Sequence, residues 1–281
     1  MKRNTTTRQC HADKGFDRRR SRQWTFAHLV NTLSIVVALY ALSTAAFAQA
    51  TLDIAQVSAP AGAIVFLPLY YAAPDEVAPA TLVMQVSSPA LAFEKPGALA
   101  TPFLAENGKM LDCEPGNYSV SLAIFGGANP IPTGTLCHLL LRVSPEAQPG
   151  NTFPIHSEAV HGADSAAAYT TVQTNSGAVL IMDAPRKHSA DTSEDWRISL
   201  PELIHVIDLY KANEYHCEDS DYAPGVGDRS CAPHDADYSP QDWRVNLSEL
   251  LRVIQMHNAP YGVYHVKQGS EDGFAPGPFG Y

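Results

Sequence analysis

The sequence predicts a mainly β protein. We expect an immunoglobulin-like or jelly-roll β-sandwich followed by a small α-helical domain of two duplicated loop–helix units. Three observations lead to this fold class. Short apolar stretches recur between turn residues over residues 51–183. A loop–helix pattern occurs twice over residues 191–281. Residues 1–48 differ from both regions, because there a basic stretch precedes an apolar one.

Residues 1–48 are organised like a secretory signal peptide. Basic residues lead into an apolar run that begins at Phe26, and the run ends in an A-x-A cleavage pattern at Ala46-Phe47-Ala48. The alternative is an uncleaved membrane anchor, which needs about 20 apolar residues, but His28 and Asn31 interrupt this run. We therefore expect a secreted protein, extracellular or at the cell surface, with no membrane span after signal removal.

Net charge and cysteine content indicate which ligands and which cysteine chemistry to expect. The 281 residues contain 19 Lys+Arg and 29 Asp+Glu, and a net charge of -10 suits cations better than nucleic acid. Four cysteines follow the signal and would meet an oxidising compartment. Three pairings are formally possible, and we expect Cys113–Cys137 and Cys217–Cys231 because each pair lies within one region. A zinc site at His216, Cys217, Cys231 and His234 is the less favoured alternative.

The region 51–183 has the alternation and turn spacing of an all-β sandwich. It contains neither a G-x-S-x-G nor an H-E-x-x-H motif, and we expect its carboxylates on the surface rather than in a catalytic pair. The expected strands cover residues 51–57, 63–71, 81–86, 118–125, 135–143, 152–155, 169–172 and 178–182.

Four features of this region occur in a fixed order. Gly62 precedes a strand that contains Pro68, Ser88–Phe93 follows a strand, Gly134–Leu136 leads into another, and residues 175–181 form the closing strand. This order resembles the cohesin domain and its carbohydrate-binding-module relatives. The resemblance implies a cohesin-like sandwich with a binding role.

The C-terminal region contains an internal repeat. Residues 195–207 (DWRISLPELIHVI) match residues 242–254 (DWRVNLSELLRVI). Apolar residues fall at i, i+3, i+4 and i+7 in both copies, which predicts two amphipathic helices. We expect the helices to pack on each other through Leu200, Leu203, Ile204 and Ile207 of the first copy and Leu247, Leu250, Leu251 and Ile254 of the second.

The segment before each helix offers oxygen ligands at the spacing of a calcium loop. In the first copy, loop positions 1, 3, 5, 7, 9 and 12 are Asp191, Ser193, Asp195, Arg197 through its carbonyl, Ser199 and Glu202. In the second copy, positions 5, 7, 9 and 12 are Asp242, Arg244, Asn246 and Glu249. Asp237 lies one residue further back than position 1, and Ser239 is a further ligand candidate. We therefore expect calcium as a cofactor.

Two features compete with this interpretation. Ser199 with Glu202, and Asn246 with Glu249, also fit a helix capping box that needs no metal. Position 6 of a calcium loop is normally Gly because the chain turns there with positive φ, but this sequence has Trp196 and Trp243. We expect strain at both tryptophans, which pack as anchors beneath the helices or form an exposed binding spot.

Two acidic loop–helix units joined to a β-module by a linker at residues 184–190 resemble a dockerin. The resemblance implies a non-catalytic protein that docks, with calcium, onto an extracellular protein partner, with a link to polysaccharide binding or degradation as a further expectation. One alternative is a carbohydrate-binding module with a C-terminal sorting or attachment repeat, and another is an enzyme with an unrecognised site.

Overall fold

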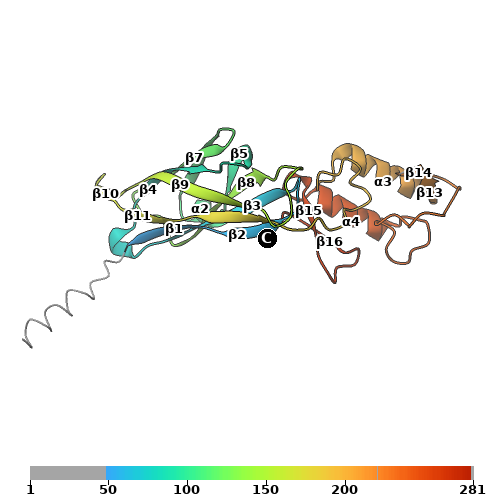
Figure 1. The fold of residues 1–281 in the computed structure, drawn as a ribbon. Coiled ribbons are helices and arrows are strands. Elements are labelled where there is room, and N and C mark those ends of the chain that lie inside the picture. The colour runs from blue at the N-terminus through green and yellow to red at the C-terminus, as the bar shows by residue number, and fades with distance from the viewer. Residues whose placement is uncertain (1–48, 220, 280–281) are drawn as a thin grey trace, which may run out of the picture. The chain divides into compact units, whose positions relative to one another are not determined.

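The computed structural model describes residues 49–219 and 221–279. The expected signal peptide therefore lies outside the described residues. Within the described residues, two large sheets form the N-terminal part, and the two longest helices and two small two-stranded sheets lie in the C-terminal region (Figure 1). None of the helices in these two ranges is long and apolar enough to span a membrane.

Two sheets form the β-sandwich that the sequence predicts. The first has the order β11-β1-β3-β8-β5, and the second has the order β2-β12-β9-β4-β7-β6 with β10 paired to β9. The strands are β1 (Ala50–Ile54), β2 (Gln56–Ala59), β3 (Ile64–Ala72), β4 (Thr81–Ser87), β5 (Ala92–Ala100), β6 (Met110–Pro115), β7 (Ser119–Phe125), β8 (Gly134–Arg142), β9 (Thr152–Ala163), β10 (Tyr169–Thr170), β11 (Val172–Asn175) and β12 (Gly177–Ile181).

The sandwich core follows the alternation of the strands. In β4, Leu82 and Met84 point inward, and in β7 Leu122 and Ile124 do the same. The chain changes sheets between β1 and β2, where Gly177 passes so close that a Cβ would lie 2.4 Å from the Ala55 carbonyl oxygen. A strand expected over residues 51–57 is therefore two strands in different sheets.

Sequence analysis missed four elements of the sandwich. The strands β5 and β6 were not expected, and neither was α2 (Pro102–Glu106), a helix of one turn whose N-cap Thr101 accepts a hydrogen bond from the Leu104 amide. A short 3-10 helix, η1 (Asp75–Val77), was also not expected. The segments concerned are short and contain Pro or Gly, so they show neither helical nor strand periodicity.

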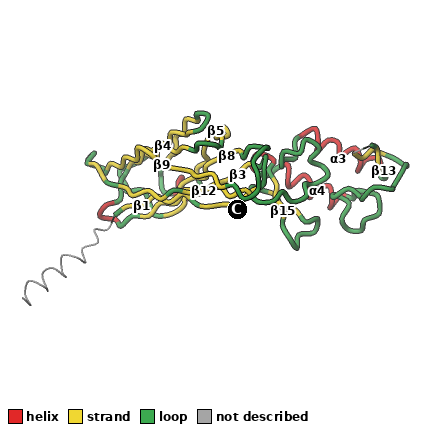
Figure 2. Tube along the Cα trace, viewed as in Figure 1, coloured by secondary structure: helices red, strands yellow, loops and turns green. Residues whose placement is uncertain are grey.

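The C-terminal region repeats a loop, a helix and a hairpin. The helices are α3 (Leu200–Ala212) and α4 (Leu247–His257), which contact each other. Each is followed by a two-stranded sheet: β13 (Tyr215–Glu218) with β14 (Asp221–Pro224), and β15 (Tyr264–Val266) with β16 (Phe274–Pro276). A 3-10 turn, η2 (Pro260–Gly262), precedes β15. Figure 2 shows these helices and short strands separated by long loops.

The buried face of each helix differs from the expected stripe. The helix α3 buries Leu203, Val206 and Leu209, and α4 buries the equivalent residues Leu250, Val253 and Met256. Half of the predicted stripe is exposed, namely Leu200, Ile204, Leu247 and Leu251. The hairpins account for the difference, because α3 contacts β14 and α4 contacts β16 in addition to the partner helix.

The sandwich and the C-terminal region belong to one compact unit. The Trp196 indole donates a hydrogen bond to the Ala61 carbonyl (3.2 Å), and Phe279 forms an isolated parallel bridge with Val65. A small apolar cluster joins Phe66 and Leu140 of the sandwich to Val263. We call the segments before the two helices loop one (residues 191–199) and loop two (residues 237–246). Loop one and the residues after β16 are thereby fixed to the sandwich.

Candidate functional site

Loop one is organised around the Asp191 carboxylate. Its Oδ2 accepts hydrogen bonds from the Trp196 amide (2.8 Å) and the Tyr264 hydroxyl (2.7 Å), and its Oδ1 accepts from the Asp195 amide (3.0 Å). Burial raises the pKa of Asp191 even though these donors oppose the shift. The Asp191 carboxylate is thus the common acceptor, or hub, of the hydrogen bonds that shape the loop. These donors offset only part of the cost of burying its charge.

Loop two repeats this arrangement around Asp237. Its Oδ1 accepts from the Asp242 amide (3.0 Å), and its Oδ2 accepts from the Trp243 amide (2.8 Å) and the Tyr215 hydroxyl (2.6 Å). Asp237 is fully buried. The extra residue in the second loop therefore leaves the hub and its donors unchanged.

The glutamate at the end of each loop joins the loop to its helix. Glu202 accepts hydrogen bonds from the Ser193 amide (2.9 Å) and the Ser199 amide (2.8 Å), and these N–H groups lower its pKa although burial acts in the opposite direction. Glu249 does the same with the amides of Ser239 and Asn246, both at 2.8 Å. Both predicted capping boxes are present, so each glutamate satisfies backbone N–H groups at the start of its helix.

The two tryptophans adopt the positive φ that a calcium loop requires at position 6. Trp196 has φ of 64° and Trp243 has φ of 65°. This backbone costs about 1–2 kcal/mol for a residue with a Cβ. Packing opposes that cost, because Trp196 is fully buried between Tyr264 and Phe279, with ring centroids 5.6 Å and 5.0 Å away. Packing as anchors, rather than an exposed binding spot, is therefore confirmed for Trp196.

Each copy supplies the hydroxyl that completes the loop of the other copy. Tyr215 belongs to β13, which follows α3, yet it binds Asp237 of loop two. Tyr264 belongs to β15, which follows α4, yet it binds Asp191 of loop one. The backbone repeats the exchange, since the Tyr215 amide donates to the Trp243 carbonyl (3.2 Å) and the Tyr264 amide to the Trp196 carbonyl (3.3 Å). The two units are therefore interlocked.

Two buried histidines lie between the loops. The ring centroids of His188 and His234 are 5.8 Å apart. Each Nδ1 accepts a hydrogen bond of 3.0 Å from the amide two residues later, Ala190 or Ala236, so each neutral ring carries its proton on Nε2. Burial lowers the pKa of both rings to about 3.

Sequence analysis missed this pair, although the sequence contains a signal for it. The segments His188-Ser189-Ala190-Asp191 and His234-Asp235-Ala236-Asp237 both read H-x-A-D. This motif lies upstream of D-W-R in both copies, and with one extra residue in the second copy it places Asp237 opposite Asp191.

The predicted ligands of loop one are only partly gathered. Asp191, Ser193 and Glu202 share hydrogen bonds, and Asp195 Oδ1 is buried with no hydrogen-bond partner. The Arg197 side chain donates from Nε to the Tyr261 carbonyl (2.9 Å), which leaves the prediction for the Arg197 backbone carbonyl untested, and Ser199 caps α3. Nowhere in residues 49–219 and 221–279 do three or more His, Cys, Asp or Glu side chains form a metal-binding group.

Several predicted ligands of loop two are exposed or make other contacts. Asp242 and Ser239 are exposed, and Arg244 forms an ion pair with Glu214 (3.1 Å). The Asn246 side chain is occupied as the N-cap of α4, where it accepts from the amides of Ser248 (2.9 Å) and Glu249 (3.2 Å). Asp237 and Glu249 are buried and accept hydrogen bonds from backbone amides of the loop.

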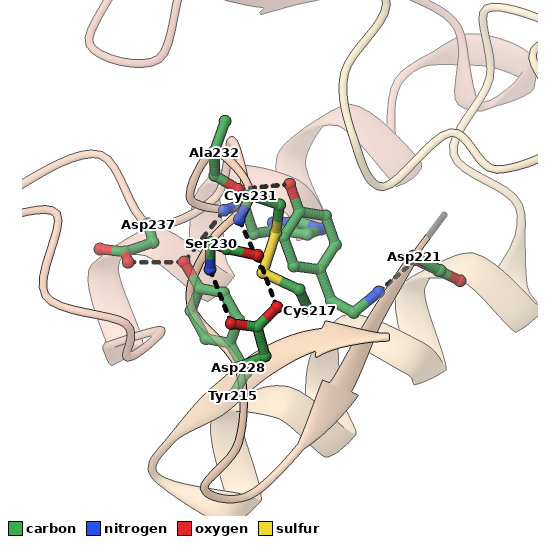
Figure 3. The surroundings of a disulfide bond; sticks show 10 residues. Tyr215, Cys217, Asp221, Asp228, Ser230, Cys231, Ala232 and Asp237 are labelled. Atoms are coloured by element: carbon green, nitrogen blue, oxygen red, sulfur yellow. Dashed lines mark hydrogen bonds between the residues drawn. A yellow bond between two sulfur atoms is a disulfide. The ribbon is translucent and has the colours of Figure 1, made fainter. Parts of the chain in front are cut away.

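One of the two expected disulfides forms. Cys217 and Cys231 are bonded, which confirms that pairing over the zinc alternative (Figure 3). The bond ties β13 to the segment before loop two, beside the hydrogen bond from Tyr215 to Asp237 that the same figure shows.

The Cys113–Cys137 pairing is wrong, because both thiols are free. Cys113 lies on β6 and Cys137 on β8, in opposite sheets. The Cys113 thiol donates instead to the Pro96 carbonyl (3.1 Å). Burial raises the pKa of Cys137 to about 12, so its reactive thiolate form is scarce.

Comparison with known proteins finds similarity to cohesins. No family model matches the chain, and no curated protein matches it. A non-cellulosomal cohesin from the archaeon Archaeoglobus fulgidus is 20% identical, with a TM-score of 0.41 over 48% of this chain and 93% of that chain. A type I cohesin–dockerin complex from Clostridium thermocellum contains a chain that is 14% identical, with a TM-score of 0.41 over 48% and 99%. A type III cohesin from a cell-surface anchoring scaffoldin of Ruminococcus flavefaciens is 16% identical, with a TM-score of 0.39 over 49% and 89%.

Removing one tyrosine hydroxyl should loosen the loop of the opposite copy. We expect Tyr264→Phe to lower the free energy of unfolding by about 1.5–3 kcal/mol, because the buried Asp191 loses a donor. Urea unfolding followed by circular dichroism measures the change, and Tyr169→Phe is the control because Tyr169 is 86% exposed. Equal stability of the two variants would contradict the role of the crossed hydroxyls.

Acid should destabilise the protein through the histidine pair. An unfolded histidine binds a proton near pH 6.5, whereas His188 and His234 remain neutral to about pH 3. Because the unfolded state binds more protons between these values, the free energy of unfolding should fall as the pH drops from 6.5 towards 3. Urea unfolding at pH 7.5 and pH 5 measures the fall. The double variant His188→Asn/His234→Asn keeps an acceptor at each position but cannot titrate, so its free energy of unfolding should fall less between pH 7.5 and pH 5. An equal fall in the variant and the wild-type protein would contradict a role for the two histidines in acid destabilisation.

Proposed function

We propose that this protein is a secreted, non-catalytic docking protein whose interlocked loop–helix repeat binds an extracellular protein partner. One observation carries the proposal. Both helices expose an apolar pair at the same repeat position: Leu200 and Ile204 on α3 are 57% and 47% exposed, and Leu247 and Leu251 on α4 are 58% and 47% exposed.

Rigidity makes these pairs suitable for recognition. Each pair lies on the first turns of its helix, next to the capping box that fixes the helix start. The face opposite the pair is buried, so the exposed side chains are held at fixed positions. A surface that is already ordered loses little conformational entropy on binding, and exposed apolar side chains gain from leaving water.

Calcium in loop one is a second part of the proposal. The ligands would be Asp191, Ser193, Asp195 and Glu202, with the Arg197 carbonyl and Ser199 completing the set. The buried Asp195 Oδ1 without a hydrogen-bond partner supports this assignment, because it lies in the same loop as the buried Asp191 carboxylate. Bound calcium would neutralise these acids and stabilise the folded loop. The ligands of loop two, and any binding of polysaccharide, stay predictions from the sequence.

The docking proposal is tested by making the apolar pairs acidic. Immobilised protein should retain an extracellular protein from the producing cells, and a combined Leu200→Asp/Ile204→Asp/Leu247→Asp/Leu251→Asp variant should lose it, because a charged face cannot be desolvated. Mass spectrometry identifies the retained protein, and its affinity is then measured with the purified pair. Val226→Asp is the control, since Val226 is 82% exposed away from the helices. Equal binding by both variants would refute the proposal.

The calcium proposal has a separate test. Calorimetric titration of chelator-treated protein with calcium should show saturable heat that Asp195→Asn reduces at least tenfold in affinity, because one charged ligand is lost. Asp208→Asn, on the exposed side of α3, should bind calcium like the wild-type protein. Absence of heat in the wild-type protein would remove calcium from the proposal and leave the docking surface to its own test.

A further inference from the structure

The two copies hold their hairpins to their helices with ion pairs that differ in one residue. In the second copy, Arg252 of α4 binds Asp272 at the start of the β16 segment (3.2 Å). The matching residue of α3 is His205, and its Nε2 lies 3.8 Å from Asp221 of β14. We propose that His205 and Asp221 form a proton-controlled latch, an ion pair that adds to the packing of the β13–β14 hairpin on α3 when His205 is protonated.

The second copy shows what a closed latch does. The Asp272 side chain is fully buried, and its Oδ1 accepts from the Phe274 amide (3.0 Å). Arg252 also donates to the Phe274 carbonyl and to Gln255 (3.2 Å). Arginine is charged at every ordinary pH, so this hairpin is tied to α4 permanently.

The first copy places a histidine at the position of Arg252, in a longer and more exposed pair: the Asp221 side chain is 46% exposed, whereas that of Asp272 is fully buried. Asp221 Oδ1 accepts a hydrogen bond from the Tyr222 amide (2.9 Å). The next aromatic ring is equivalent in the two copies: the ring centroids of Tyr222 and His234 are 4.9 Å apart, and so are those of Phe274 and His188. The separation of His205 from Asp221 suits an ion pair but is too long for a hydrogen bond. The buried Nε2 of His205 has no hydrogen-bond partner. Histidine changes charge between pH 5 and 8, so a proton would supply the attraction that Arg252 provides in the other copy.

The groups around His205 favour Asp221 as its partner. From β14 it faces Asp221, and from the segment before loop two it faces His234, which stays neutral to about pH 3. On α3 itself, Asp208 is three residues away and pairs with Lys211. Asp221 is therefore the one unpaired acid among these groups.

The latch has an effect beyond its own hairpin. The β13–β14 hairpin carries Tyr215, whose hydroxyl completes the Asp237 hub of loop two. Closing the latch would thus stabilise the bonds that hold the opposite loop. This effect is independent of calcium and of any docking partner, because it depends only on residues within the chain.

Hydrogen exchange in the full chain tests the latch. After correction for intrinsic exchange, the amides of β13 and β14 should be about two- to fivefold better protected at pH 5.5 than at pH 7.5, the range expected of a partly exposed ion pair. The β15–β16 hairpin of the same molecule is the internal reference and should lack this gain. Acid destabilisation through His188 and His234 has the opposite sign and acts on both hairpins.

Substitutions give a second measurement. His205→Arg, which copies the second unit, should protect β13 and β14 equally at both pH values. His205→Gln and Asp221→Asn should abolish the gain at pH 5.5. The proposal is overturned if β13–β14 and β15–β16 of the wild-type protein respond to pH alike, or if His205→Gln keeps the wild-type response.

Discussion

The C-terminal region depends on a pair of crossed hydrogen bonds from tyrosine hydroxyls to buried carboxylates. Tyr264 donates to Asp191 and Tyr215 donates to Asp237, each across the boundary between the two copies. A buried carboxylate without donors is costly, so neither loop is complete until the hairpin of the other unit is in place. This constraint explains why two short helices, each too small to be stable alone, form a defined structure.

The loops combine two roles that are usually considered separately. Backbone amides within each loop bind its aspartate, and an amide at the start of each helix binds its glutamate. These bonds satisfy N–H groups that would otherwise lack partners at a helix N-terminus. The same acids are oxygen ligands suited to a hard cation, so an acidic loop serves as a helix cap and, in the first copy, as our proposed calcium site.

Much of this architecture could be predicted from sequence, and the errors have physical causes. Alternation and turn residues identified most of the sandwich strands, and the 3.6-residue period identified both helices. The period does not say which flank of an apolar stripe will be covered, so Leu200 and Ile204 were expected in the core although they are exposed. Which side of the stripe is buried depends on the hairpins, and these are formed by residues that follow each helix in the chain. Pairing of Cys113 with Cys137 was inferred from their shared region, but position in a sheet decides which thiols meet.

Because the two units are interlocked, a fragment that keeps this structure must contain both of them, which matters for protein engineering. A fusion tag made from one unit would carry an aspartate hub without its tyrosine and a tyrosine without its aspartate. Such a fragment would pair most readily with a second copy of itself, by exchanging hairpins between molecules. Transplanting the region onto another protein therefore requires both units together, from the first histidine of the H-x-A-D motif to the final hairpin.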